Sequence, residues 1–177
     1  ALAHEHGEGL LARPWIDLAQ LYREVAAFYG VYDSVMQAII LALLVAHGPP
    51  STALKSLGDA EKAAPDDPLP LFFEAVLAMR SAKNEKAVAL LTKASAMEPT
   101  NARFALALAH ALDRKGSPDA LAAYAHAAEL DPKVAEPWIA SALIVHATGE
   151  AEDAETRLLA AIEAEPRNPE PLYYLAI

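Results

Sequence analysis

The sequence predicts an all-α fold built as a solenoid of stacked helix pairs, and two observations carry this prediction. Of the 177 residues, 41 are alanine and only 20 are Val, Ile or Thr, and alanine favours helices because it loses no side-chain entropy there. Prolines then recur at a nearly constant interval, at Pro65, Pro99, Pro132 and Pro166. An interval of about 34 residues is typical of repeating helix-turn-helix units. The same composition excludes an all-β domain.

Three further columns of residues share the period of the prolines. Each unit has an alanine twelve residues before its proline, a large side chain four residues later, and a second alanine three residues after that. Small residues let two helices approach closely while large ones fill the space between them, so we expect these columns to be buried at helix seams. The columns are Ala53/Ala87/Ala120/Ala154, Leu57/Leu91/Tyr124/Leu158 and Ala60/Ala94/Ala127/Ala161.

Within each unit the apolar periodicity predicts a first helix of about 13 residues, a short break and a second helix of about 12. Breaks inside the units are expected near 48–50, 82–84, 115–117 and 148–150, and breaks between units near 65–68, 99–101, 132–135 and 166–169. Polar or small residues at the start of each second helix are expected to cap it. These expected caps are Ser51, Asn84, Ser117 and Gly149.

The units resemble tetratricopeptide repeats, whose pattern is W-x2-L-G-x2-Y, then A-x3-F, then P within each repeat. The segments 34–67, 68–100, 101–134 and 135–168 carry this pattern, with Leu41 and Leu108 at the small position of two first helices. Trp15-x2-Leu18-Ala19-x2-Tyr22 reproduces the first-helix motif with alanine for glycine. The resemblance implies a right-handed α-solenoid that binds other proteins.

Both ends of the chain depart from a full repeat. We expect residues 1–13 to be a flexible segment, 14–33 to form an N-terminal capping helix or partial repeat, and 169–177 to begin a further repeat. End repeats need a polar outer face, whereas the last residues, PLYYLAI, are apolar. We therefore expect further sequence or a partner to cover the C-terminal end.

Composition excludes several classes of function. The formal charge is −10 with no cluster of Lys or Arg, so nucleic acid is a poor candidate partner. The absence of cysteine removes thiol catalysis, zinc fingers and iron–sulfur clusters. The longest apolar run, 35–46, is shorter than the roughly 20 residues that cross a bilayer, and the common catalytic and nucleotide-binding motifs are missing. We expect a protein without a transmembrane segment in this chain, without a cofactor and without enzymatic activity.

The resemblance implies that four positions of each first helix face an inner groove. Most of these positions are apolar, with Ala102, Ala105 and Ala109 on the third unit, and they lack the Lys, Asn and Arg with which some family members hold a peptide carboxylate. The groove is therefore expected to hold an apolar or helical segment of a partner protein, although a missing segment of this chain or a second copy could fill it, and a basic partner could instead use the acidic outer surface. The expected groove residues are Val35, Val45, Leu69, Phe72, Val76, Met79, Leu112, Ile139, Leu143, His146 and Tyr173.

An alternative function rests on the N-terminal His4-Glu5-His6 sequence with Glu8. Imidazoles that alternate along an extended segment suit Zn, Cu or Ni, so the chain could be an extracytoplasmic metal-handling protein or an accessory subunit of a redox complex. Two histidines and a carboxylate make a weak metal site, and we favour a polar leader without metal. The Ala1-x-Ala3 pattern is typical of a signal-peptide cleavage site, which favours the bacterial periplasm and cell envelope over the cytoplasm, although an ordinary alanine-containing terminus explains it too.

Overall fold

The computed structural model describes residues 50–176, and the contacts within the chain divide it into two compact units, Ala1–Arg80 and Ser81–Ile177. Several predictions fall outside the described residues. They concern the segments 1–13 and 14–33, the metal candidates His4, His6 and Glu8, and the groove residues Val35 and Val45. The division of the chain into four repeats stays a prediction.

The described part of the first unit is a pair of helices, α3 (Pro50–Ala63) and α4 (Leu69–Arg80). The residues Ala53, Leu57 and Ala60 of α3 are buried against Leu77 of α4, and Phe73 and Val76 pack around this cluster. The break between the helices falls in the predicted stretch that contains Pro65.

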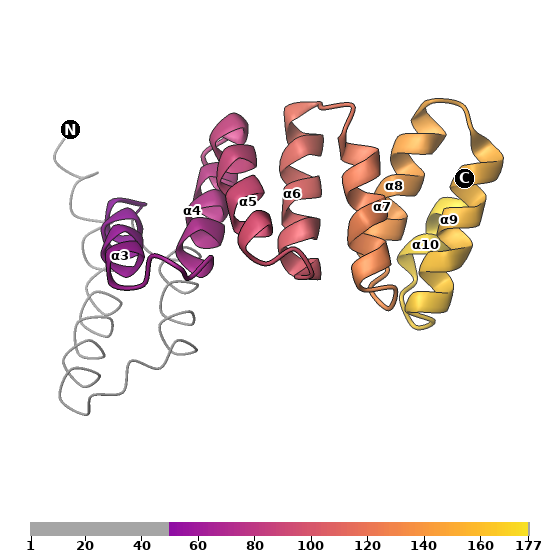
Figure 1. Cartoon of the computed structure of the whole chain (residues 1–177). Helices are drawn as coiled ribbons and strands as arrows, with labels where there is room; N and C mark the ends of the chain where they lie inside the picture. The colour runs from indigo at the N-terminus through magenta and orange to yellow at the C-terminus, as the bar shows by residue number, and fades with distance from the viewer. Residues whose placement is uncertain (1–49, 177) are drawn as a thin grey trace, which may run out of the picture. The chain divides into compact units, whose positions relative to one another are not determined.

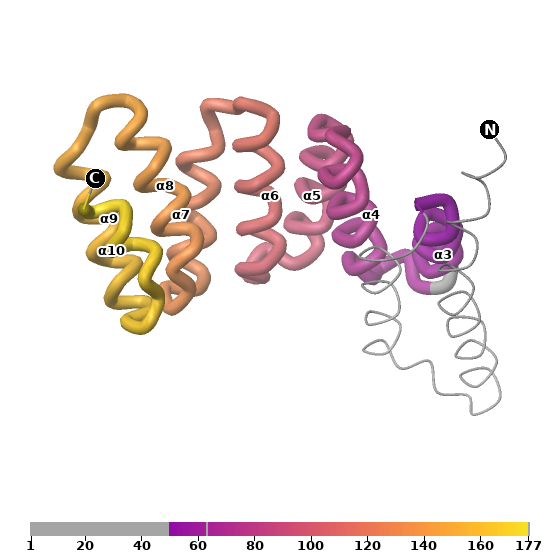
Figure 2. The backbone as a smooth tube through the Cα atoms, turned by 180° about the vertical axis from the view of Figure 1, so that it is seen from behind, coloured from indigo at the N-terminus to yellow at the C-terminus, as the bar shows by residue number. Residues whose placement is uncertain are grey.

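The second unit is a succession of helices that lie side by side in alternating directions (Figures 1 and 2). Across the described residues of both units every regular element is a helix, which confirms the all-α prediction. No helix of this part of the chain is long and apolar enough to cross a membrane. The helices of the second unit are α5 (Asn84–Met97), α6 (Ala102–Lys115), α7 (Ala120–Leu130), α8 (Glu136–Ala147), α9 (Ala151–Ala164) and α10 (Glu170–Leu175).

The three seam columns are buried, as the sequence predicts. The alanines of the first and third columns are at most 3% exposed, and the large residues of the middle column are at most 6% exposed. Tyr124, the only member of the middle column that is not leucine, is 1% exposed. These side chains therefore have structural roles in packing each second helix.

Most side-chain caps lie elsewhere than predicted, in the turns before α4, α6 and α10, which join one predicted repeat to the next. Asn101 accepts hydrogen bonds from the backbone N–H groups of Arg103 and Phe104 at the start of α6. Asp67 does the same for Leu69 before α4, and Asn168 for Glu170 before α10. Three predicted caps were wrong in position, because Ser51 and Asn84 lie inside α3 and α5 and Gly149 precedes the cap residue Glu150 of α9. The hydroxyl of Ser117 accepts a hydrogen bond of 3.4 Å from the N–H of Asp119, the residue before α7.

The equivalent residue before α8 is Val134, which has no side-chain acceptor. The missing cap is supplied from the following turn, where Oε1 of Glu165 accepts a hydrogen bond of 3.0 Å from the N–H of Ala135. Asn168 donates to the other oxygen of the same carboxylate. A valine in this turn is therefore tolerated because Glu165 satisfies the start of α8.

Candidate functional site

In the second unit, α6, α8 and α10 are the first helices of successive helix pairs. Residues of these three helices and of the turns beside them line a hollow of about 430 Å³ centred on α8. We call it the α8 pocket. It is lined by one residue of α6, the turn before α8, α8 itself, the turn that follows α9, and the first residue of α10. Its lining residues are His110, Val134, Glu136, Ile139, Ala140, Leu143, Glu165, Asn168 and Glu170.

The apolar wall of the pocket is made by α8 and the turn before it. Ile139 is 4% exposed and packs on Ala135 and Ala161, so it forms the base of the wall and offers little surface of its own. Leu143, one turn further along α8, is 39% exposed. Leu143 is thus the most exposed apolar side chain of this wall.

The polar rim of the pocket is acidic. Glu136 and Glu170 are the first residues of α8 and α10, where a carboxylate is stabilised by the positive end of the helix dipole. Glu165 adds a third carboxylate, and no Lys or Arg lines the pocket. The pocket therefore combines an apolar wall with a rim that holds three carboxylates.

A chain of hydrogen bonds runs from a helix seam to this rim. The hydroxyl of Tyr124 lies 2.8 Å from Nδ1 of His110 and 3.3 Å from Oδ2 of Asp113, and Nε2 of His110 lies 2.9 Å from Oε1 of Glu136. The rings of Tyr124 and His110 meet edge to face. Burial raises the pKa of Tyr124 far above its ordinary value, and the nearby carboxylates of Asp113 and Glu136 raise it further. Tyr124 is therefore a neutral hydrogen-bonding group that orients His110.

The expected inner face of α6 is displaced by one residue. Ala109 of α6 is fully buried, and so are the equivalent alanines of the neighbouring repeats, Ala75 of α4 and Ala142 of α8. The small position of α6 is therefore Ala109 and not Leu108. Ala105 is buried too, and Leu112 is half-buried and does not line the α8 pocket. His110 is the residue of α6 that reaches it. The spacing of the buried alanines was the sequence signal that could have identified His110.

The remaining predicted groove residues are distributed between the two units. Leu69, Phe72, Val76 and Met79 lie on α4 and are half-buried, and Phe72 contacts Phe73 edge to face. His146 and Tyr173 are exposed on α8 and α10. Of the predicted set, the α8 pocket brings together only Ile139 and Leu143. The repeat frame also turns Glu136 and Glu170 inward, but sequence reasoning left them out of the groove set because most inner positions are apolar, and it gave no signal for Glu165.

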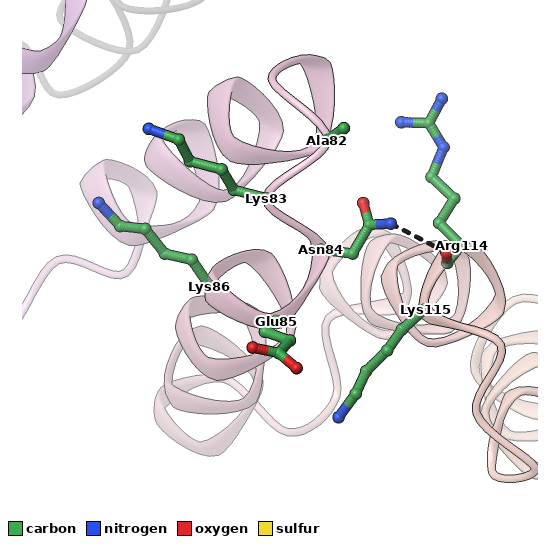
Figure 3. A pocket seen from close by; sticks show the side chains of 7 residues that line it. All are labelled: Ala82, Lys83, Asn84, Glu85, Lys86, Arg114 and Lys115. Carbon is green, nitrogen blue, oxygen red and sulfur yellow. Dashed lines mark hydrogen bonds between the residues drawn. The ribbon is translucent and has the colours of Figure 1, made fainter.

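A second hollow, of about 500 Å³, lies where α5 begins and α6 ends. Figure 3 shows that the side chains of Lys83 and Lys86 extend to the same side, away from Asn84, whereas Lys115 extends in another direction, so the three ammonium groups do not converge on one point. Nδ2 of Asn84 donates to the backbone carbonyl of Arg114, which ties the start of α5 to the last turn of α6. We interpret this hollow as a structural junction between two helix ends.

Metal ligands do not converge in the described residues: no group of three or more His, Asp or Glu side chains is arranged to hold an ion. Within the α8 pocket, His110 and Glu136 face one another, and Glu165 is engaged with Ala135 and Asn168. The pocket is therefore suited to contact with another molecule through apolar and carboxylate groups.

No family model and no curated protein matches the sequence, but solved structures share its fold. A crystal structure of MamA is similar with a TM-score of 0.69 at 17% identity, over 84% of this chain and 87% of that one. The first TPR of Spaghetti (RPAP3), bound to the HSP90 peptide SRMEEVD, is similar with a TM-score of 0.58 at 21% identity, over 62% of this chain and 88% of that one. The chain has a tetratricopeptide-repeat fold.

A third tetratricopeptide-like neighbour is the Yersinia enterocolitica type III secretion chaperone SycD in complex with a peptide of the translocator YopD. It has a TM-score of 0.54 at 25% identity, over 60% of this chain and 82% of that one. Two of these three neighbours were thus solved with a peptide of another protein bound. The tetratricopeptide fold of the present chain places the α8 pocket on its first helices.

Proposed function

We propose that this protein is a non-catalytic interaction scaffold that holds an apolar or helical segment of a partner protein against its first helices. The observation that carries the proposal is the α8 pocket, in which Leu143 presents apolar surface beside polar groups that can fix the orientation of a bound chain. A few well-placed polar groups in a mostly apolar hollow are typical of binding sites. The peptides bound to SycD and to the RPAP3 repeat support a role of this kind.

The polar groups of the pocket favour binding over catalysis. Tyr124 is 1% exposed and its pKa is raised, which keeps the phenol neutral and out of reach of a substrate. His110 is held between that phenol and Glu136. We therefore assign this chain of groups the task of shaping the rim of a binding surface.

The proposal is tested by affinity capture from the native source with the full chain as bait. The variant Leu143→Gln removes apolar surface from the pocket, whereas Leu159→Gln makes the same change at a leucine of α9 that is 49% exposed and lies outside the pocket lining. We expect partners identified by quantitative mass spectrometry to be lost with Leu143→Gln and retained with Leu159→Gln. Equal capture by the wild type and both variants would contradict the proposal.

A double variant, Phe72→Gln with Leu143→Gln, extends this test to the half-buried aromatic residue of α4. We expect it to abolish capture while leaving the far-ultraviolet circular dichroism spectrum helical, because neither side chain belongs to a fully buried column. The N-terminal alternative, metal handling by His4, His6 and Glu8, concerns residues outside the described part. Calorimetric titration with Cu and Zn, with and without residues 1–9, tests it separately.

A further inference from the structure

We infer that the occupant of the α8 pocket is a partner segment that presents an arginine or lysine next to an aliphatic side chain. This inference rests on the proposed function and adds the chemistry of the bound segment. It begins from the two kinds of surface that the pocket joins, an apolar wall around Leu143 and a rim with three carboxylates and no Lys or Arg.

The apolar wall includes a position where the fold itself favours a polar residue. The turns before α4, α6 and α10 carry Asp67, Asn101 and Asn168, each of which accepts backbone N–H bonds at the start of a helix. The equivalent residue before α8 is Val134, and it lines the pocket. The bond that Glu165 accepts from Ala135 permits a residue without an acceptor at this position, but it does not call for an apolar one, whereas contact with an apolar group of a partner does.

The rim determines the charge of that partner. Glu136 is 59% exposed and Glu170 is also exposed, on the α8 and α10 sides of the pocket respectively. Both oxygens of Glu165 accept bonds from Ala135 and Asn168, and Oε1 of Glu136 faces Nε2 of His110. Oε2 of Glu136 and the carboxylate of Glu170 are therefore the acceptors placed to receive donors from a bound chain. An acidic segment would meet like charges there, which disfavours it.

Exposed aromatic surface next to the rim favours arginine over lysine. Tyr173 follows Glu170 by three residues on α10, so the two side chains share one face of the helix, and Tyr173 is 64% exposed. A guanidinium can pair with a carboxylate and stack on an aromatic ring at the same time. We expect the bound segment to place its basic group between Glu136, Glu170 and Tyr173 and its aliphatic group against Leu143.

The test uses the full chain and an array of short synthetic peptides that share a central pair of leucines. One set flanks the leucines with Arg, a second with Lys, a third with Glu and a fourth with Gln. We expect the wild type to retain the Arg set best, the Lys set next, and the Glu set least. Affinities of the best peptides are then measured in solution by fluorescence anisotropy.

Matched variants assign the preference to residues. Glu136→Gln with Glu170→Gln should weaken binding of the Arg peptides roughly three- to tenfold, the range that two ion pairs on a rim supply, and should weaken binding of the Gln peptides less, because these carry no charge. The control, Glu152→Gln with Glu155→Gln, removes two exposed charges from α9 and should change neither. Raising the salt concentration should reduce the Arg preference in the wild type.

The possible failures are distinguishable. Equal retention of the Arg, Glu and Gln sets, with binding still lost in Leu143→Gln, would overturn this inference and leave the proposed function intact. Binding that is insensitive to Leu143→Gln, or no retention of any set, would overturn both. If light scattering shows that the wild type self-associates and the Glu136→Gln/Glu170→Gln variant does not, the occupant is a second copy of this chain and the inference is wrong.

Discussion

The hydroxyl of Tyr124 and Nδ1 of His110 lie 2.8 Å apart, and this contact joins the interior of one helix seam to the rim of the α8 pocket. The phenol can donate to Nδ1 of His110 while Nε2 of the same ring donates to Glu136, or it can donate to Oδ2 of Asp113. The hydroxyl therefore has hydrogen-bond partners on two side chains of α6, which the leucines of the same column could not use.

The raised pKa of Tyr124 predicts a specific loss of stability at alkaline pH. Because the folded state raises this pKa above its ordinary value of 10.0, the stabilisation is fully present below about pH 10 and is lost as the pH rises towards the folded-state pKa. The variant Tyr124→Phe lacks the ionising group, so its free energy of unfolding should decline less steeply above about pH 10. Urea unfolding at a series of pH values measures the difference.

The matched control for this prediction is Tyr173→Phe, which removes a phenol that is 64% exposed. Its pH dependence should follow that of the wild type, including the general loss of stability that a protein of charge −10 suffers as further groups become negative. Parallel curves for the wild type and Tyr124→Phe would contradict the assigned environment of Tyr124.

The break between α4 and α5 holds backbone strain that the later breaks avoid. Ala82 has φ +54°, whereas the equivalent left-handed positions in the next two units are glycines, Gly116 with φ +73° and Gly149 with φ +89°. A side chain at positive φ costs roughly 1–2 kcal/mol. We expect Ala82→Gly to relieve this strain and to raise the free energy of unfolding by up to about 1 kcal/mol. The gain is smaller than the strain because glycine also adds entropy to the unfolded chain, which opposes folding.

The reverse substitutions provide the comparison. A Cβ added at Gly116 or Gly149 would meet nothing within 4 Å, so any loss of stability in Gly116→Ala or Gly149→Ala comes from the backbone alone. Each should be destabilised by roughly 1 kcal/mol in urea unfolding. A destabilised Ala82→Gly variant, or a neutral Gly116→Ala variant, would show that strain at these positions does not control stability.

Sequence periodicity predicts the fold well because the seam columns are set by steric packing that repeats from unit to unit. Ala53, Ala87 and Ala120 must all be small because each lies where two helices pack closely, so alanine recurs in the sequence at the interval of the repeat. The residues of the functional face are less predictable because one repeat is a single residue shorter than its neighbours. Counting positions from one repeat to the next therefore predicted that Ala105 and Ala109 of α6 face inward, whereas the structure places His110 at the pocket. Contacts across helices, such as Tyr124 to His110, have no repeat signature at all.

The buried alanine columns limit the size of side chains at the seams. Ala120 is 3% exposed at the first position of α7, and Ala120→Leu should overpack the seam and lower the free energy of unfolding by roughly 1–3 kcal/mol. Ala122→Leu makes the same change at an exposed position of α7 and should be close to neutral. An unchanged melting temperature for Ala120→Leu would argue against the seam assignment.

Substitutions of Val134 test whether this residue is kept for binding at a cost in folding stability. Asn168 occupies the equivalent position before α10 and accepts a hydrogen bond of 3.0 Å from the N–H of Glu170, so an asparagine at 134 should accept one from Glu136. Val134→Asn and Val134→Ala both remove the valine from the pocket wall, but only the first supplies a cap. We expect Val134→Asn to be more stable than Val134→Ala by about 1 kcal/mol in urea unfolding.

Binding should separate from stability in these two variants. Both variants lose the apolar contact of Val134. Both should therefore bind the peptides whose leucines are flanked by Arg more weakly than the wild type does, whichever variant is more stable. Half-buried apolar surface at a binding site contributes in proportion to the area removed from water, and the two variants lose a similar area. If Val134→Asn bound as well as the wild type, the valine would not belong to the contact surface, and the bond that Glu165 accepts from Ala135 would be the whole explanation for the departure of this turn from the pattern Asp67, Asn101 and Asn168.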